Sequence, residues 1–419
     1  MYLSANRAAD AAKGVPRPAA GPAVAGNVLV LGLVSLVTDV SAEMVTAVLP
    51  LYLVVGLGMS PLAFGALDGL YQGATAFLRL AGGHLADRTE RHKLVAGTGY
   101  ALSAVCKLAL LAVSTPWAMG AVLAADRAGK GLRTAPRDAL ISLSAPPEGQ
   151  GRAFGVHRAM DTAGALLGPL VAFGVLWAAH DAYEAVFTVS FCVAAFAVLL
   201  LALFVRDVRA RPDRTPRPQR AAPARPGGRG LGPVLRDRGV RRLALAAALF
   251  GVFTVGDSFV YLLLQRRLDL PAAAFPLLPV ATAAGFLLLA VPLGRLADRA
   301  GRGPVFLAGH AALAVAYLLL LSPLGGAAPA VLVLLLLGAF YAATDGVLMA
   351  AAGPLLPVRL RASGMAVVQT AQALARFAGA LLFGAGWTYA GPGTALAGAA
   401  IGLTLSLAAA GILGKGALR

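Results

Sequence analysis

Two carboxylates stand four residues apart within a long apolar run, and this spacing places Asp39 and Glu43 on one face of a helix. Acids this close repel each other, so the pair suits a group that takes up a proton or a cation. If the run crosses a membrane, a charge at that depth is costly unless it is paired or hydrated. Three interpretations stay open: a proton carrier, a contact for a basic substrate, or a buried pair satisfied by another helix.

A second charged group lies within the apolar stretch 116–140, where Asp126 and Lys130 are one helical turn apart and can pair. Arg127 points elsewhere on the helix and needs an acid or water as its partner. The plainer alternative is a structural ion pair that joins helices of the first half. Charges nearer the end of this stretch predict cytoplasmic clamps rather than substrate contacts; they are Arg133, Arg137 and Asp138.

Other apolar runs carry single charges. Asp257 and Asp345 occupy, in the second half of the chain, positions close to those of Asp39 and Asp126 in the first. Arg376 then requires an acid nearby, and Asp39 or one of the second-half aspartates could supply it. Further candidates for the same site, each of which could instead serve packing or a helix end, are Asp68, Lys107, Asp161 and Tyr261.

The composition indicates that membrane helices carry these charges. The chain has 419 residues, of which 58% are hydrophobic and 13% charged, and its mean hydropathy is +0.76. A soluble protein carries about a quarter charged residues, so this composition argues against a soluble enzyme. A spanning helix needs roughly 20 mostly apolar residues. Twelve runs qualify: 27–55, 61–82, 94–114, 116–140, 153–178, 183–205, 241–264, 274–294, 303–323, 328–351, 365–389 and 393–413.

The basic residues indicate an orientation rather than a nucleic-acid site. The net charge of +17 comes from arginines that lie between the apolar runs and form no continuous basic face. They gather in the connections after even-numbered runs, which places both termini in the cytoplasm. The predicted organisation is an N-terminal tail (1–26), six helices (27–205), a flexible Arg- and Pro-rich cytoplasmic linker (206–240), six helices (241–413) and a C-terminal tail (414–419).

The sequence GxLADR occurs twice, after the second and the eighth apolar run. Two copies in equivalent connections are a strong signal of an internal repeat. The residues of the two copies are Gly83, Asp87, Arg88 and Arg91, and Gly294, Asp298, Arg299 and Arg302. On this motif the chain resembles the major facilitator superfamily, over nearly its whole length. The first copy departs from the family pattern, because Glu90 replaces the usual glycine and His92 the usual lysine.

The resemblance implies roles for several residues. In the family the loop motif takes part in the conformational switch, which implies that Asp87 and Asp298 latch the cytoplasmic side. The fourth apolar run, 116–140, is similar to the LxxxRxxxG motif of the drug:proton antiporter branch, and in that branch the arginine is linked to proton coupling. The matching arginine in this sequence is Arg127. The chain departs from the motif at Lys130, which stands in place of the usual glutamine. A GxxxGP pattern in the fifth run resembles an antiporter motif and favours export; its residues are Gly164, Gly168 and Pro169.

Motifs for other chemistry are missing from the sequence. It contains no Walker-type phosphate loop, HExxH, paired CxxC or Gly-x-Ser-x-Gly elbow, so we expect no ATP-driven pump, no enzyme, no metal and no cofactor. We predict an all-α integral membrane protein with twelve transmembrane helices in two pseudo-symmetric six-helix bundles. We expect a monomer in the bacterial cytoplasmic membrane that exports a small molecule in exchange for protons. The alternatives are a proton symporter or facilitator importing a nutrient or siderophore-like metabolite and, more remotely, a non-transporting sensor.

Overall fold

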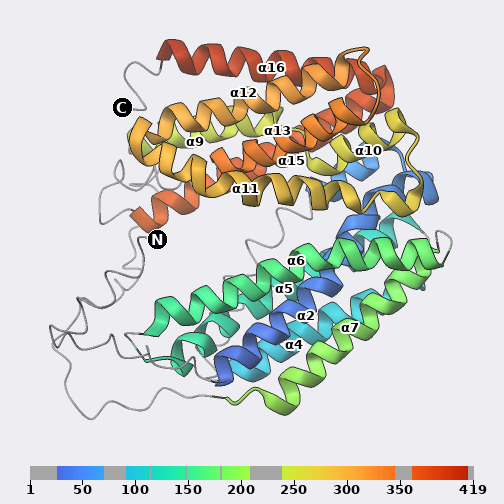
Figure 1. Cartoon of the computed structure of the whole chain (residues 1–419), viewed down its shortest axis with the longest axis vertical. Helices are drawn as coiled ribbons and strands as arrows, with labels where there is room; N and C mark the ends of the chain where they lie inside the picture. Colours follow the sequence, from blue (N-terminus) through green and yellow to red (C-terminus); the bar gives the residue numbers. More distant parts are fainter. Residues whose placement is uncertain are drawn as a thin grey trace, which may run out of the picture.

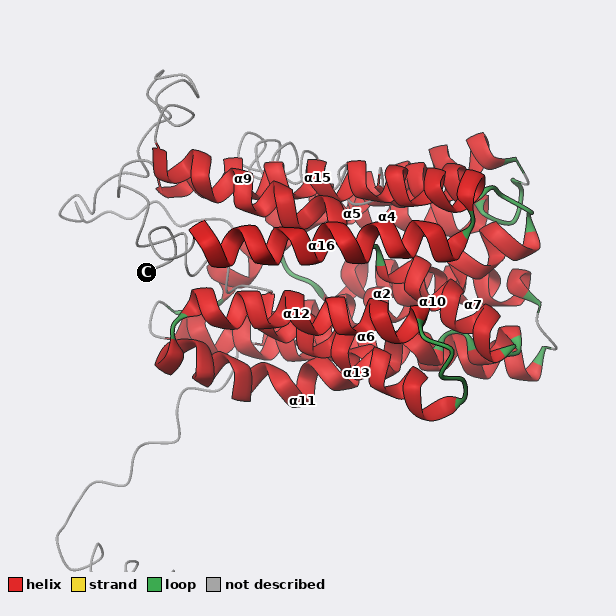
Figure 2. Ribbon diagram, turned by 90° about the horizontal axis from the view of Figure 1, so that it is seen from above, coloured by secondary structure: helices red, strands yellow, loops and turns green. Residues whose placement is uncertain are grey.

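Helices make up all of the regular structure in the part of the chain that the computed structural model describes. Figure 2 shows them lying roughly parallel to one another, with short connections. The described residues are 26–69, 91–113, 115–146, 149–179, 182–207, 238–344 and 361–413. Almost all of the predicted tails and of the predicted linker therefore lie outside the described residues.

The first half of the chain forms long helices from its apolar runs. The bounds are α2 (Gly26–Leu51), continued by the π-helical turn η1 (Tyr52–Gly56), a helical segment at 61–69, α4 (His92–Ala109), α5 (Pro116–Ser144), α6 (Gln150–Ala178) and α7 (Tyr183–Phe204). The start of α5 is capped: the Thr115 side chain accepts the Ala118 N–H, and Pro116 occupies the first helical position.

The second half is built similarly. Its helices are α9 (Arg238–Phe253), α10 (Asp257–Leu268), the 3-10 turn η3 (Ala272–Ala274), α11 (Leu277–Ala300), α12 (Arg302–Leu321), α13 (Ala327–Thr344), α15 (Arg361–Ala390) and α16 (Pro392–Leu413). Near the end of α10, the Arg267 guanidinium donates to the carbonyl oxygens of Leu319 and Leu320 at 3.0 and 2.7 Å. This arginine ties α10 to the last turn of α12.

Eight helices or pairs of consecutive helices within the described ranges are long and apolar enough to cross a membrane. Most of their bounds lie within a few residues of the predicted runs, while the runs at 61–82 and 328–351 continue into residues outside the described ranges. The prediction of one continuous helix over 241–264 was wrong. α9 ends at Phe253, and α10 starts at Asp257.

The same helix pairings recur in the two halves. In the first half, α2 packs on α6 and α7, and α4 packs on α5 and α7. In the second half, α9 packs on α15 and α16, and α12 packs on α13 and α16. Counted along the chain, these are the same four pairings, so the repeat in sequence extends to the packing of the helices.

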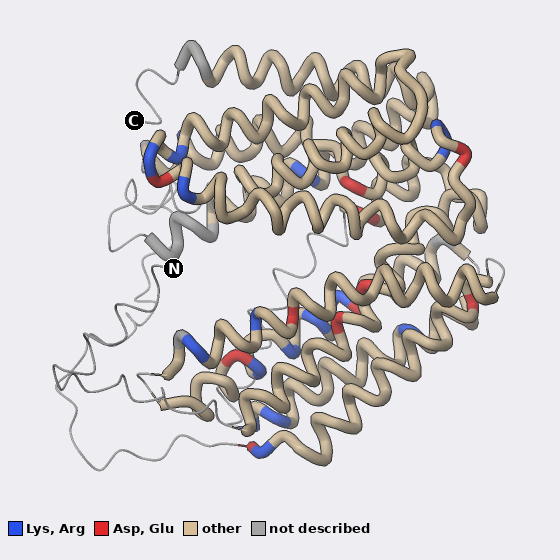
Figure 3. The backbone as a smooth tube through the Cα atoms, in the orientation of Figure 1, with Lys and Arg blue, Asp and Glu red and all other residues tan. Residues whose placement is uncertain are grey.

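The two halves lie close together at one end of the molecule and spread apart at the other (Figure 1). At the closed end, the Leu62 N–H donates to the Thr388 Oγ1 of α15 at 3.0 Å, and α6 packs on η3. At the spread end, Arg299 lies in the last turn of α11 and Arg302 starts α12, and Figure 3 shows several basic residues gathered there. The molecule therefore has two unlike ends.

Candidate functional site

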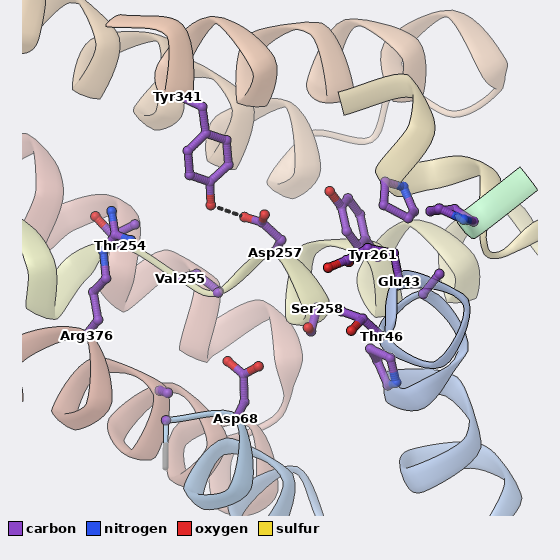
Figure 4. A pocket seen from close by; sticks show the side chains of 17 residues that line it. Glu43, Thr46, Asp68, Thr254, Val255, Asp257, Ser258, Tyr261, Tyr341 and Arg376 are labelled. Carbon is purple, nitrogen blue, oxygen red and sulfur yellow. Dashed lines mark hydrogen bonds between the residues drawn. The ribbon is translucent and has the colours of Figure 1, made fainter. Parts of the chain in front are cut away.

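A cavity of about 250 Å³ lies between the two halves. Carboxylates, hydroxyl groups and a guanidinium line it, which is unusual for the interior of so apolar a protein (Figure 4). Its polar lining consists of Glu43, Thr46 and Asp68 from the first half, and Thr254, Asp257, Ser258, Tyr261, Tyr341 and Arg376 from the second. Charged groups at a seam between two helical halves mark this cavity as the candidate solute site.

The cavity reaches the break between α9 and α10. α9 ends at Phe253, and the residues from Thr254 to Gly256 are not helical. Backbone groups freed by such a break need partners within the protein when water is excluded. The Val255 N–H donates to the Tyr317 hydroxyl of α12 at 2.8 Å, and that hydroxyl lies 3.4 Å from the Phe253 carbonyl oxygen, to which it can donate. Tyr317 therefore stabilises the break.

Asp257 enters the cavity because of this break. It is the first residue of α10, so its carboxylate lies at the positive end of that helix. The Tyr341 hydroxyl of α13 donates to Asp257 Oδ1 at 2.6 Å (Figure 4). A short hydrogen bond to a charged acceptor is among the stronger kinds, so it fixes the carboxylate in place.

Asp68 approaches Asp257 from the first half. Figure 4 shows its carboxylate directed toward the segment between Val255 and Asp257. A Cβ atom added to Gly256 would lie 3.0 Å from Asp68 Oδ2, so the carboxylate reaches the backbone of the break. Across the described ranges, the Asp68 carboxylate has no hydrogen bond and no ion pair, and the charge of Asp257 acts on it as a like charge.

Arg376 lines the same cavity from α15, beside Thr254 in Figure 4. Its Nε atom is buried and has no hydrogen-bond partner. The expected ion pair with Asp39 or Asp257 is absent from the described residues, because Asp39 pairs with Arg133 instead and Asp257 binds a tyrosine. The third expected partner, Asp345, lies outside the described residues.

A series of ion pairs runs along α5 next to the cavity. Basic residues of α5 recur every three or four positions and thus share one face of the helix; they are Arg127, Lys130, Arg133 and Arg137. The distances are 2.9 Å for Lys107–Asp126, 3.4 Å for Arg127–Asp126, 4.0 Å for Lys130–Glu43 and 3.6 Å for Arg133–Asp39. The expected pairing of Asp126 with Lys130 was wrong, since Asp126 binds Lys107 of the adjacent α4 and Lys130 reaches Glu43 of α2.

Arg133 and Arg137, which the sequence predicts as clamps near the cytoplasmic end of this helix, form contacts within the first half. Arg133 is buried and lies over the Tyr100 ring at 4.6 Å, in addition to its ion pair. Arg137 lies 2.9 Å from Asp138 and 3.7 Å from Asp161 of α6. These residues therefore continue the ion series inside the first half, and Asp161 of α6 belongs to it.

A family profile described as Major Facilitator Superfamily matches residues 31–380. The chain belongs to this superfamily. An uncharacterised MFS-type transporter of Methanocaldococcus jannaschii is 36% identical over 183 residues, which are 43% of this chain and 45% of that relative. The match thus covers less than half of that relative's length.

Two solved transporters have the same fold as this MFS protein. A mutant of the nucleoside transporter NupG superposes with a TM-score of 0.77 at 15% identity, over 92% of this chain and 98% of that one. A mutant of the peptide transporter POT gives a TM-score of 0.73 at 17% identity, over 93% and 95%. At such low identity the likeness shows the helical fold alone. Family and fold together indicate a multi-pass membrane protein.

The GxxxGP residues of this MFS protein have a clear packing role. A Cβ on Gly164 would overlap the Leu36 carbonyl oxygen of α2, and a Cβ on Gly168 would lie 2.7 Å from the Glu43 Cβ. Both glycines therefore allow α6 and α2 to approach closely. Pro169 follows directly and lines the cavity.

The second GxLADR copy lies within the described residues, whereas most of the first copy lies outside them. In the first, Gly83, Asp87 and Arg88 lie outside the described residues, and Arg91 is an exposed residue just before α4. The second was expected in a loop, but Gly294, Asp298 and Arg299 lie in the last turns of α11 and Arg302 starts α12. Only Gly301, with φ of 93°, connects the two helices. Asp298 is exposed and forms no ion pair within the described ranges.

Part of the cavity lining is not evident from the sequence. Asp68 was only a secondary candidate there, and Tyr341, Thr254 and Ser258 were not among the candidates. A buried tyrosine in an otherwise apolar run needs a partner for its hydroxyl, and this was the available signal for Tyr341. For Asp68, the decisive fact is its approach to the break after α9, which no local pattern shows.

Proposed function

We propose that this MFS protein exports a small molecule in exchange for protons, by alternating access of the cavity to the two sides of the bacterial cytoplasmic membrane. Twelve spans form two pseudo-symmetric six-helix bundles, both termini face the cytoplasm, and one chain acts alone. The recurring helix pairings support the two bundles. The resemblance of the α6 glycine pattern to an antiporter motif supports export.

One observation carries the proton coupling: Glu43 belongs both to the cavity and to the ion series on α5. Its carboxylate lines the cavity and lies 4.0 Å from the Lys130 ammonium. Asp39, one turn earlier on α2, pairs with Arg133 of the same α5 face. A change of charge at Glu43 therefore alters the ion series and the solute site together.

The proposed cycle uses these exchanges of partners. A proton on Asp39 or Glu43 removes its negative charge and releases Arg133 or Lys130. The solute binds the cavity more tightly in one arrangement than in the other, because only differential binding can couple it to the change. Arg127, which contacts Asp126 on the same helix, takes the coupling role that its family motif implies.

The spread end faces the cytoplasm in this proposal. Arg299 and Arg302 lie there, and basic residues favour the inner side of a membrane. The structure then corresponds to a state open to the inside. Asp298 is exposed in this state, and we infer that it forms its latching contact when the spread end closes.

The test is flux into vesicles that contain the purified full-length protein. A panel of small solutes is offered with an imposed pH gradient of either sign. Proton antiport predicts accumulation when the lumen is acidic and loss of accumulation with a protonophore. Asp39→Asn and Arg127→Ala should reduce it to background because both remove coupling charges, while the exposed Glu184→Gln on α7 should not.

Each other outcome has a defined meaning. Accumulation driven by an acidic exterior would replace export with symport. Movement of no solute at all would contradict transport, and normal flux in both coupling variants would show that coupling lies elsewhere.

A further inference from the structure

Two opposite charges line the cavity, and neither has an ion-pair partner among the residues that the structure describes. Asp68 has neither a hydrogen bond nor an ion pair within the described ranges, and the Nε atom of Arg376 is buried without an acceptor. Both groups lie in the cavity, yet they do not pair with each other. Because an uncompensated charge is costly inside a membrane, each of them requires a counterpart, and no residue of the described ranges supplies it.

We propose that the cavity binds a small zwitterion, with its ammonium group between Asp68 and Asp257 and its acidic group on Arg376. This inference rests on the proposed function, since it names the chemical class of the transported solute. It also assigns a binding role to Asp68.

The donors and acceptors fit such a ligand. An ammonium group donates three hydrogen bonds, and the Asp68 carboxylate offers unused acceptors, while Asp257 already accepts one from Tyr341. A guanidinium binds a carboxylate or phosphate in a two-pronged geometry. The volume of about 250 Å³ lies below the roughly 300–1,000 Å³ of sites for drug-sized molecules, so the ligand is small.

Ligands with a single charge fit less well. A lone cation compensates the two aspartates but leaves Arg376 without an acceptor. A lone anion satisfies Arg376 but leaves the carboxylates of Asp68 and Asp257 as neighbouring like charges. A zwitterion satisfies both ends of the cavity and adds no net charge.

The same geometry connects ligand binding to the conformational change. Asp68 belongs to the first half and Arg376 to the second. A ligand held at both residues links the halves, and its contacts are strongest when the halves are at the right separation. Such a ligand binds the two states unequally, which alternating access requires.

The experiment compares matched ligands on the purified full-length protein. The panel holds the twenty amino acids and small aminoalkyl phosphonates, each with the amine that lacks its acidic group and the acid that lacks its amine. Calorimetry measures binding at neutral pH. At least one zwitterion should bind tenfold or more tightly than both of its analogues, because each charged contact lowers the dissociation constant by about that factor. An amine or an acid that binds as tightly as its zwitterion would overturn the proposal, as would a panel in which no zwitterion binds.

Two variants then assign the contacts. Asp68→Asn should remove the preference for the zwitterion over the acid, and Arg376→Gln should remove the preference over the amine. Glu184→Gln and Arg242→Gln, both exposed, are the matched controls and should retain both preferences. Unchanged preferences in folded cavity variants would overturn the assignment. If a variant does not fold, the comparison of each zwitterion with its analogues on the unmodified protein still tests whether the cavity prefers a zwitterion.

Flux separates this inference from the proposed function. If an amine or an acid accumulates under a pH gradient while zwitterions do not, the zwitterion site is wrong and proton-coupled transport stands. If no class of solute moves, the proposed function itself fails.

Discussion

At the scale of single residues, the ion series on α5 depends on a carboxylate that two bases share. Asp126 contacts Lys107 at 2.9 Å and Arg127 at 3.4 Å, and the Lys107 side chain is only 3% exposed. Removing one partner of a buried ion pair leaves a charge uncompensated. The two sides of this contact are unequal, because Asp126 has two bases whereas Lys107 pairs with one acid within the described ranges.

Asp126→Asn should therefore destabilise the protein more than Lys107→Met. We expect the aspartate variant to lose about 3 kcal/mol or more of unfolding free energy, and the lysine variant to lose less because Arg127 remains beside Asp126. Thermal unfolding in detergent measures both, with Glu184→Gln as the control. A lysine variant at least as unstable as the aspartate variant would contradict this order.

Residue types and spacing could identify most of the ion series but not its pairings. Asp39, Glu43, Arg127 and Lys130 were candidates because charges in apolar runs are conspicuous. Their partners depend on how α4 and α2 are rotated against α5, and that is a property of packing between helices. This explains why the local pairing of Asp126 with Lys130 was predicted, while the pairing of Asp126 with Lys107 was found only in the structure.

At the scale of helices, the contact between α2 and α6 positions Glu43. Gly168 of α6 faces Glu43 so closely that an added Cβ would lie 2.7 Å from the Glu43 Cβ and 2.8 Å from the Val40 carbonyl oxygen. The glycine is therefore needed for this approach. Gly174, two turns further along the same helix, has nothing within 4 Å of such a Cβ.

Gly168→Leu should force α6 away from α2, whereas Gly174→Leu should be tolerated. Overpacking of this kind costs about 1–3 kcal/mol, and it displaces the carboxylate that joins the cavity to the ion series. We expect a lower melting temperature and at least tenfold slower gradient-driven flux for the first variant alone. Equal behaviour of the two leucine variants would show that this contact can relax.

The helices themselves were largely predictable, whereas the break after α9 was not. Apolar runs of sufficient length specify helices in a membrane, because a helix satisfies its own backbone. The sequence Thr254-Val255-Gly256 contains no proline, and a glycine alone is a weak signal of a break. The hydroxyl that holds the broken backbone comes from Tyr317, 62 positions away from Val255.

At the scale of the whole molecule, the repeat was predictable and the conformation was not. Two GxLADR copies indicated two related halves, and four helix pairings recur in them. The separation of the halves differs between the two ends of the molecule (Figure 1). One sequence must support more than one such separation for transport, so no pattern in it can specify the single one observed.

Alternating access requires the closed end to open. Leu62→Cys with Thr388→Cys, in a chain without Cys106 and Cys192, places two thiols where a backbone N–H now donates to a side-chain oxygen at 3.0 Å. A short bifunctional methanethiosulfonate should join them and stop flux, and a reductant should restore it. Each single-cysteine variant should be unaffected by the reagent. Full flux in the crosslinked protein would show that this end need not separate.

The interruption at Thr254–Gly256 also determines how this span can move. A continuous helix that tilts sharply must lose some of its own hydrogen bonds. Here the helical hydrogen bonds of the backbone are already interrupted, and the Tyr317 hydroxyl of α12 accepts the Val255 N–H. The segments before and after the interruption can consequently change their mutual angle without melting a turn, and the acid that opens α10 moves with them. A change in the shape of the cavity therefore requires no local unfolding of the backbone.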